Sequence, residues 1–468
     1  MVSMREVELI EDDEPHTTGT AAVPAAPLRA GRARLSRRWL LVPVAGLAVL
    51  VALQQGLASV ERHREHRFDG LPGFVTPVHP PLRALWESDP NLQMDPRPVG
   101  RAVLAVESVD VLAVRLVDVT TGKTLWRTLL TNAGTIARCS PENHTSGATP
   151  TRVVCVVSDY PEGGGSVPGE VTVLDGATGD RVATWQVSGA TSFDAADGLV
   201  VFASDEGKGR GEAHAHHLLD GTPAWTTPIG GSRDDSNPFG AVFIAAGEVV
   251  VVDSTASLRR LNLLDGTELA PAQSLMSLQP ELAGRAAHVT TVSAGGRATT
   301  TVIAGPGRDV DVAGTDRSLV ADDGSLPGVA FTQDENLAAY DARTGKLRWQ
   351  APYPTLEVLV RDHVVYASFV TGVVALDGRT GRLLWRTDVG REVSQLLTDG
   401  VHVLVHVSGG DGESEGDSPR PATGKVVALG PGDGKVEWSS ALPHGDDGYL
   451  VCTDGVLLSL GERLARIG

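Results

Sequence analysis

Residues 340–349 read YDARTGKLRW, and the chain repeats this phrase 36 positions later as LDGRTGRLLW at 376–385. The shared pattern is Asp-x-x-Thr-Gly-x-x-x-Trp, and each copy follows a run of β-branched and aliphatic residues. An Asp side chain closes an Asx-type turn and Gly adopts a positive φ at low cost, so the pattern predicts a hairpin. The returning strand delivers Trp to the sheet face, which is typical of a packing wedge between neighbouring units.

The phrase recurs with decreasing fidelity along the chain. Copies at 118–126 and 175–185 keep its main residues, those at 219–225 and 429–438 are degraded, and Ala270 stands where another Trp would fall. Trp86 joins the series because RALWESD (83–89) matches RLLWRTD (382–388). The residues that we assign to the repeated motif are Trp86, Asp118, Gly122, Trp126, Asp175, Gly179, Trp185, Gly221, Trp225, Asp341, Gly345, Trp349, Asp377, Gly381, Trp385, Gly434 and Trp438.

The spacing of these strands predicts the architecture. Units of four short strands that recur at roughly 40–50 residues are typical of β-propeller blades. High Gly and Pro contents (54 and 28 residues) with few aromatic residues fit short strands joined by tight turns. We therefore expect an all-β fold, an eight-bladed β-propeller. Seven blades remain possible if Trp86 lies outside the ring, and nine if the interval 270–349 holds two blades, with ATTTVIAG (298–305) as a strand of the second.

The two ends of the propeller region complement each other. The C-terminal part contains three strand-like pieces with no Trp strand after them, and the segment around Trp86 is a Trp strand preceded only by linker. We expect the ring to close by pairing the first strand with the last, which removes the open sheet edges of a linear array.

Residues 39–60 carry no charged side chain, and 22 helical residues span about 33 Å, enough to cross a bilayer core of roughly 30 Å. The Arg-rich segment 29–38 precedes them, which by the positive-inside rule places the N-terminus in the cytoplasm. A cleaved signal peptide or a buried helix is the alternative, but the leader is long and lacks a cleavage signature. We expect a disordered cytoplasmic tail at 1–38, a single transmembrane helix at 39–60, a juxtamembrane linker at 61–80 and an extracytoplasmic propeller at 81–468.

The net charge of −18 lies entirely on residues 61–468, because six acidic and six Arg side chains cancel within 1–38. An acidic domain of this kind repels nucleic acid, so we exclude nucleic-acid binding.

The repeated phrase resembles the tryptophan-docking repeat of the pyrroloquinoline quinone (PQQ)-type propellers. These include quinoprotein alcohol dehydrogenases and cofactor-free relatives such as the propeller lipoprotein of the outer-membrane assembly machinery. The resemblance covers about 81–468 and implies an eight-bladed ring. The enzymes of the family carry a vicinal disulfide, and many carry a haem site. This chain has no adjacent cysteines and no CxxCH motif, and the family's Glu, Asn and Asp calcium ligands match no stretch of it. We expect no cofactor, and keep PQQ with calcium as the alternative.

Two pairs of residues, one of cysteines and one of histidines, are candidates for a chemical role. Cys139 and Cys155 stand on strands that flank one loop, and we predict a disulfide between them rather than two buried thiols. His214 and His216 share one strand face, which is the spacing of a metal chelate and also of an exposed polar strand. We assign no catalytic and no metal-binding residue.

The function that we expect is that of a membrane-anchored, non-catalytic protein-binding scaffold in a bacterial cell envelope, with one envelope protein as its unidentified partner. A ring of blades leaves its connecting loops free to vary on a stable framework, which suits binding. The alternatives are a PQQ-dependent oxidoreductase and a sensor of a small envelope ligand or glycan.

Overall fold

The structure is a computed structural model in which Glu61–Gly468 form one compact unit. The predicted tail at 1–38 and the predicted transmembrane helix at 39–60 lie outside the described residues. Within the described ranges, no helix is both long and apolar enough to cross a membrane. The described residues are 66–68, 71, 73–88, 96–108, 111–132, 135–143, 150–159, 168–188, 192–205, 211–229, 239–245, 247–253, 257–280, 287–292, 297–303, 309–408, 424–443, 449–460 and 463–468.

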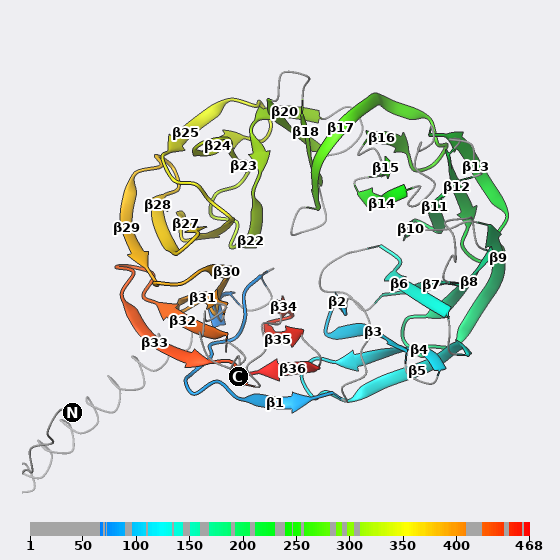
Figure 1. Cartoon of the computed structure of the whole chain (residues 1–468), viewed down its shortest axis with the longest axis horizontal. Coiled ribbons are helices and arrows are strands. Elements are labelled where there is room, and N and C mark those ends of the chain that lie inside the picture. The colour runs from blue at the N-terminus through cyan, green and yellow to red at the C-terminus, as the bar shows by residue number, and fades with distance from the viewer. Residues whose placement is uncertain are drawn as a thin grey trace, which may run out of the picture. The chain divides into compact units, whose positions relative to one another are not determined.

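Over these residues the chain forms a ring of nine four-stranded antiparallel blades (Figure 1). The all-β propeller is confirmed, but the expected count of eight blades, like the alternative of seven, is wrong. The 13-residue strand β17 explains the difference, because its first half is the outer strand of one blade and its second half the inner strand of the next. That next blade has neither the Thr-Gly turn nor the Trp, so the repeat pattern does not reveal it, although ATTTVIAG does contain one of its strands.

The first four blades follow the chain from β2 to β17. Each is a meander that runs from an inner strand beside the ring axis to an outer strand at the rim. Their strands are, for blade 1, β2 (Arg97–Val99), β3 (Ala102–Ser108), β4 (Val111–Asp118) and β5 (Thr124–Asn132); for blade 2, β6 (Thr135–Pro141), β7 (Arg152–Asp159), β8 (Pro168–Asp175) and β9 (Arg181–Ser188); for blade 3, β10 (Ser192–Ala196), β11 (Leu199–Asp205), β12 (Gly211–His217) and β13 (Pro223–Pro228); and for blade 4, β14 (Phe239–Ala245), β15 (Glu248–Asp253), β16 (Ser257–Asn262) and β17 (Glu268–Pro280).

The remaining blades complete the ring, and β22 (Ser318–Asp322) is an additional strand that pairs in parallel with the inner strand of blade 7. The strands are, for blade 5, β17, β18 (Ala287–Val292), β19 (Ala298–Ile303) and β20 (Asp309–Ala313); for blade 6, β21 (Thr315–Asp316), β23 (Val329–Gln333), β24 (Leu337–Asp341) and β25 (Leu347–Ala351); for blade 7, β26 (Glu357–Arg361), β27 (Val364–Phe369), β28 (Gly372–Asp377) and β29 (Leu383–Asp388); for blade 8, β30 (Val393–Thr398), β31 (Val403–Val407), β32 (Lys425–Leu429) and β33 (Val436–Ala441); and for the closing blade, β34 (Tyr449–Thr453), β35 (Val456–Leu460), β36 (Leu464–Ile467) and β1 (Ala84–Glu87).

The closing blade joins the two ends of the ring, as the sequence predicted. Strand β1 pairs antiparallel with β36, with Ala84 opposite Ile467 and Glu87 opposite Ala465. Figure 1 shows β1 in blue beside β36 in red. The ring is therefore closed by hydrogen bonds between strands that lie almost 400 residues apart in sequence.

The hydrophobic core is divided among the junctions between blades. Within the described residues, eight apolar clusters each draw side chains from two neighbouring blades. The junction between blades 5 and 6 has no such cluster among these residues. Polar contacts hold it instead, since Thr300 Oγ1 donates to the Gly314 carbonyl and Asp316 Oδ1 lies 2.6 Å from His288 Nδ1.

The repeated phrase docks six of the blades onto the blade that follows. The Trp385 ring lies over Gly434 of the following blade, and its Nε1 donates to the Pro431 carbonyl at 2.9 Å. The Gly has a positive φ, and a Cβ atom there would clash with the Trp385 indole. The same arrangement pairs Trp86 with Gly122, Trp126 with Gly179, Trp185 with Gly221, Trp225 with Gly266 and Trp349 with Gly381.

The Asp of the phrase builds the turn, as expected of an Asx-type motif. In the copy at 376–385, Asp377 Oδ1 accepts bonds from both the N–H and the hydroxyl of Thr380, which lowers the pKa of Asp377. Asp341 makes the equivalent bonds to Thr344, and Arg348 together with Thr344 lowers its pKa to about 2. In the copy at 376–385 the carboxylate fixes the turn that holds Gly381 under the indole of Trp349 in the preceding blade.

Two glycines of blade 7 separate the cost of backbone strain from the cost of losing the Trp contact. Gly381 and Gly390 both have a φ of 71°, but only Gly381 lies under an indole, that of Trp349. We expect Gly390→Ala to destabilise the chain by about 1 kcal/mol through left-handed strain alone. Gly381→Ala should cost about 1–3 kcal/mol more, because the methyl group overpacks the junction. Denaturant unfolding of the two variants tests this, and equal losses would contradict the docking role.

Candidate functional site

Polar side chains on the inner strands connect neighbouring blades around the axis. Asp194 Oδ2 in blade 3 accepts the backbone N–H of Ile244 in blade 4 at 2.8 Å. Glu357 Oε2 in blade 7 accepts the N–H of Leu396 in blade 8 at 2.6 Å. Each of these carboxylates therefore accepts a hydrogen bond from a backbone N–H on the inner strand of the next blade.

The same arrangement continues into the closing blade. Gln395 Nε2 donates to the Leu450 carbonyl and Gln395 Oε1 accepts the Leu450 N–H, at 2.9 and 2.7 Å. On blade 1, Arg97 Nη1 donates to Ser140 Oγ of blade 2. These polar groups of the inner wall are committed to contacts between blades.

Glu357 and Cys452 are the two groups of this wall whose pKa values rise most. Burial raises the pKa of Glu357 to about 7, against the opposing effect of the Leu396 N–H. Burial, with the nearby Glu357 charge, raises the pKa of the Cys452 thiol to about 12. A thiol with this pKa stays protonated at neutral pH and is a poor nucleophile.

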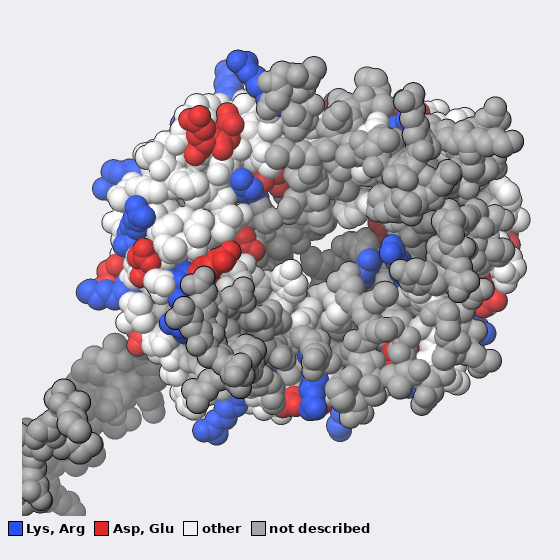
Figure 2. Space-filling model, in the orientation of Figure 1, with Lys and Arg blue, Asp and Glu red and all other residues white. Residues whose placement is uncertain are grey.

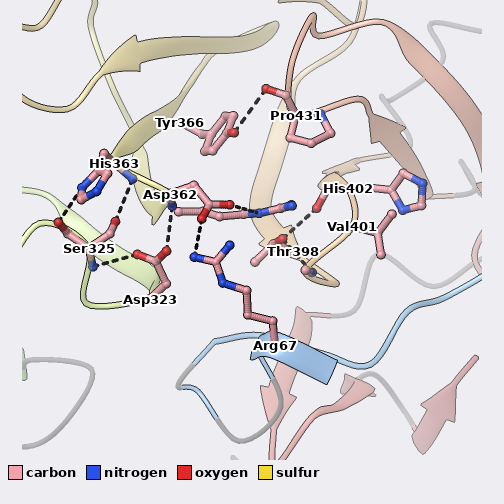
Figure 3. A network of polar contacts seen from close by, with 12 residues as sticks. Arg67, Asp323, Ser325, Asp362, His363, Tyr366, Thr398, Val401, His402 and Pro431 are labelled. Carbon is pink, nitrogen blue, oxygen red and sulfur yellow. Dashed lines mark hydrogen bonds and ion pairs between the residues drawn. The ribbon is translucent and has the colours of Figure 1, made fainter. Parts of the chain in front are cut away.

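A second site lies on the face that carries the turns between the first and second strands of the blades. Figure 3 shows its polar network over blades 7 and 8. Asp362 and His363 form the turn of blade 7, both with a positive φ. Asp323 accepts the Asp362 N–H at 2.7 Å, and Ser325 accepts the His363 N–H at 2.8 Å. Contacts from β22 and the loop after it therefore hold two left-handed residues that are not glycine.

The segment before β1 lies across this face. The described residues 67, 68, 71 and 73–82 include contacts with blades 7 and 8 and the closing blade, and we call them the strap. Arg67 Nη2 lies 2.7 Å from Asp362 Oδ1 (Figure 3), and the Arg361 guanidinium stacks 5.0 Å from the Phe68 ring. Arg361 is almost completely buried, and its Nη1 has no hydrogen-bond partner in the described part of the chain.

The turn of blade 8 receives the middle of the strap. Asp399 is fully buried, and its Oδ2 accepts the Val78 N–H at 3.3 Å and contacts His402 Nδ1 at 2.9 Å. The other ring nitrogen of His402 lies 3.2 Å from Glu437 Oε2. The hydrogen bond to Asp399, with the charges of Asp399 and Glu437, raises the pKa of His402. Sequence analysis did not single out this cluster, because its members come from distant segments.

The residues singled out in the sequence occupy structural positions in the described part of the chain. Cys139 and Cys155 form a disulfide across strands β6 and β7. His214 contacts Ser204 and His216 contacts the Gly221 carbonyl, with ring centroids 6.4 Å apart. Among the described residues, no group of three or more His, Cys, Asp or Glu side chains is arranged to hold a metal ion.

Two residues of the predicted motif depart from its pattern. Gly345 lies against the backbone carbonyl of Asp311 in blade 5 instead of an indole, because that blade has no Trp. Trp438 packs in a T-shaped contact with His402, and its buried Nε1 has no hydrogen-bond partner within the described ranges.

Fold and site together define a closed, Trp-docked propeller whose inner polar groups join the blades. The family model of the outer membrane protein assembly factor BamB matches residues 167–357 and 285–452. These matches span more than half of the chain, which therefore belongs to this family of PQQ-like repeat propellers.

Solved structures with a similar fold have low sequence identity. BamB from Moraxella catarrhalis is 14% identical, with a TM-score of 0.44, over 82% of this chain and 99% of the other. A eukaryotic initiation factor is 13% identical, with a TM-score of 0.48, over 79% and 90%. A quinohemoprotein alcohol dehydrogenase from Pseudomonas putida is 12% identical, with a TM-score of 0.35, over 78% and 77%. No curated protein matches the chain.

The pKa of Glu357 leads to a pH dependence of stability. A raised carboxyl pKa means that folding favours the protonated form, so the contribution of this group is complete below about pH 4 and is lost as the pH rises through about 7. We expect Glu357→Gln to match the wild type at pH 4 and to exceed its unfolding free energy at pH 8 by on the order of 1–3 kcal/mol.

Denaturant unfolding at pH 4, 6 and 8 provides the measurement. The matched control is Glu392→Gln, which changes an exposed carboxylate in the loop before β30. A Glu357→Gln variant whose stability follows the wild type at every pH would show that this carboxyl is not the source of the effect.

Proposed function

We propose that the chain is a non-catalytic protein-binding scaffold of the cell envelope. Membership of the BamB family supports an envelope role. The proposal that the chain is non-catalytic rests on the contacts that the polar side chains of the inner strands make. Asp194, Glu357 and Gln395 bind backbone groups of the neighbouring blade, so they serve ring assembly.

The surface that suits a partner lies on the outer strands. Leu125 of blade 1 is 56% exposed and directly precedes Trp126. Leu347 of blade 6 is 53% exposed and lies two residues before Trp349. Other exposed apolar side chains occupy the same strands or their counterparts, and these are Leu85, Leu129, Val182, Leu383, Leu384 and Val436. Apolar groups at the rim provide buried area on association, while the mixed charges seen on one face in Figure 2 favour specificity over non-specific adhesion.

The proposal also includes the membrane. The uncharged segment 39–60 would anchor the chain with 1–38 in the cytoplasm and the ring outside it. Only six residues separate that segment from Arg67, where contacts with the ring begin.

Site-specific photo-crosslinking tests the scaffold. A photoreactive amino acid at Leu125 or Leu347 of the full chain should crosslink one discrete envelope protein in cells, because both positions are exposed. The same amino acid at the buried position Val251 is the matched control and should give no product. The chain should stay in the membrane fraction after alkaline extraction. A chain that is released, or that crosslinks to no protein from either rim position, would refute the proposal.

A cofactor-free scaffold also has a thermal signature. A ligand that binds the folded state raises stability by RT ln(1 + [L]/Kd), about 2.7 kcal/mol at a hundredfold excess over Kd. We expect PQQ with calcium to leave the melting temperature of the full chain unchanged. A rise of several degrees, with dye-linked alcohol oxidation, would instead favour the oxidoreductase.

A further inference from the structure

The closing blade differs from the others in how its outer strand is attached. Strand β1 is joined to β36 by interstrand hydrogen bonds, and the two strands stand at positions 84–87 and 464–467, so no short turn connects them. The neighbouring backbone adds one reciprocal pair, between Arg83 and Gly468. The ring can therefore open here without breaking a chain connection.

The Trp contact is incomplete at the same place. Six indoles donate from Nε1 to a carbonyl in the turn between the third and outer strands of the next blade. Trp438 of blade 8 faces the closing blade, where β36 and β1 have no such connecting turn. Its Nε1 is buried, and no described residue of the chain accepts a hydrogen bond from it. The junction between blade 8 and the closing blade therefore lacks the contact that fastens six of the other junctions.

The strap supplies contacts at this junction. Leu82 and Val78 are buried in the apolar cluster that Trp438 also packs against. The Leu82 N–H donates to Ser440 Oγ of blade 8 at 2.9 Å, and the Thr76 N–H donates to the Gly455 carbonyl of the closing blade at 2.7 Å. One segment thus binds both sides of the junction.

The strap continues beyond the junction to blade 7. The Val75 N–H donates to the Thr398 carbonyl at 3.0 Å, and Phe74 stacks on Phe68 with ring centroids 4.8 Å apart. Both rings are buried in the apolar cluster between blades 7 and 8. Arg361 stacks on Phe68, and its Nη1 has no hydrogen-bond partner among the described residues, so this face places an aromatic side chain against a buried cation.

We propose that the face over blades 7 and 8 and the closing blade is a binding site for an extended, apolar segment, and that the strap of the same chain is its ligand. Bound in this site, the strap acts as a clasp, which means that it holds blade 8 and the closing blade together. It thereby replaces the Trp–turn contact that this junction lacks. A load applied from the N-terminal side of residue 67 reaches the clasp before it reaches β1.

Hydrogen exchange of the full chain, with or without the variant Phe68→Ala/Phe74→Ala, tests the clasp. The two changes remove aromatic rings of the strap and leave every blade strand intact. We expect amides of β1, β33 and β36 to exchange at least tenfold faster, while β11 and β12, across the ring, keep their rates. The matched control is Phe202→Ala, which removes an equally buried ring in blade 3 and should speed exchange there but not in β1 or β36.

A second, milder variant keeps the test informative if the double variant does not fold. Val78→Ala removes two methyl groups from the cluster beside Trp438 and should increase exchange in β1 and β36 in the same direction by a smaller factor. Unchanged exchange in the closing blade of either folded variant would overturn the proposal. A uniform increase around the whole ring would do so as well, because it would show general destabilisation without local opening.

Discussion

The ring depends on one repeated contact, an indole seated on a left-handed Gly with its Nε1 bonded to a carbonyl of the same turn. Trp385 on Gly434 shows what this contact requires. The Gly can carry no side chain, the turn must present its carbonyl, and the Trp must stand at a fixed place on the preceding blade. These joint requirements explain why the phrase Asp-x-x-Thr-Gly-x-x-x-Trp is written several times. The carboxylate shapes the turn, the turn positions the Gly, and the Gly receives the indole.

The ring closes although three junctions lack the complete contact. Ala270 replaces the Trp between blades 4 and 5, where Arg260 of blade 4 instead pairs with Asp309 of blade 5 through two bonds of 2.8 and 3.0 Å. Glu248 bonds the same guanidinium from within blade 4. Polar contacts between threonines and backbone carbonyls hold blades 5 and 6, and the strap spans the closing junction. These three kinds of contact occur at the junctions where the repeated phrase is incomplete. A degraded copy of the phrase therefore indicates a junction that is held by contacts other than Trp docking.

The sequence predicts a blade wherever the residues that make its packing contact lie close together in one short motif. The copies at 340–349 and 376–385 identify blades because turn, strand and wedge all lie within ten residues. The repeat does not reveal blade 5, because an ion pair and threonine hydrogen bonds join this blade to its neighbours, and these have no local sequence pattern. The segment of strand β19 is the part of blade 5 that the sequence analysis recognised as a strand. The strap and the cluster around His402 were not predicted either, because the contact between Val78 and Asp399 joins residues 321 positions apart. The spacing of residues in the sequence does not predict such contacts, and the composition of the strap alone predicts a linker.

The central claim is that nine blades close the ring and that polar bonding replaces Trp docking where the phrase fails. A double-mutant cycle on Arg260→Met and Asp309→Asn measures this most directly, since the pair joins the unpredicted blade 5 to blade 4. Each single change should cost about 3–5 kcal/mol or less, with the larger loss for Arg260→Met, because it leaves the buried Glu248 carboxylate without its cation, whereas Asp309→Asn leaves Arg260 paired with Glu248. The account predicts a coupling free energy of about 1.5–3 kcal/mol between the two sites. Additivity within about 0.5 kcal/mol would contradict it, because the two strands would then not be docked as neighbouring blades.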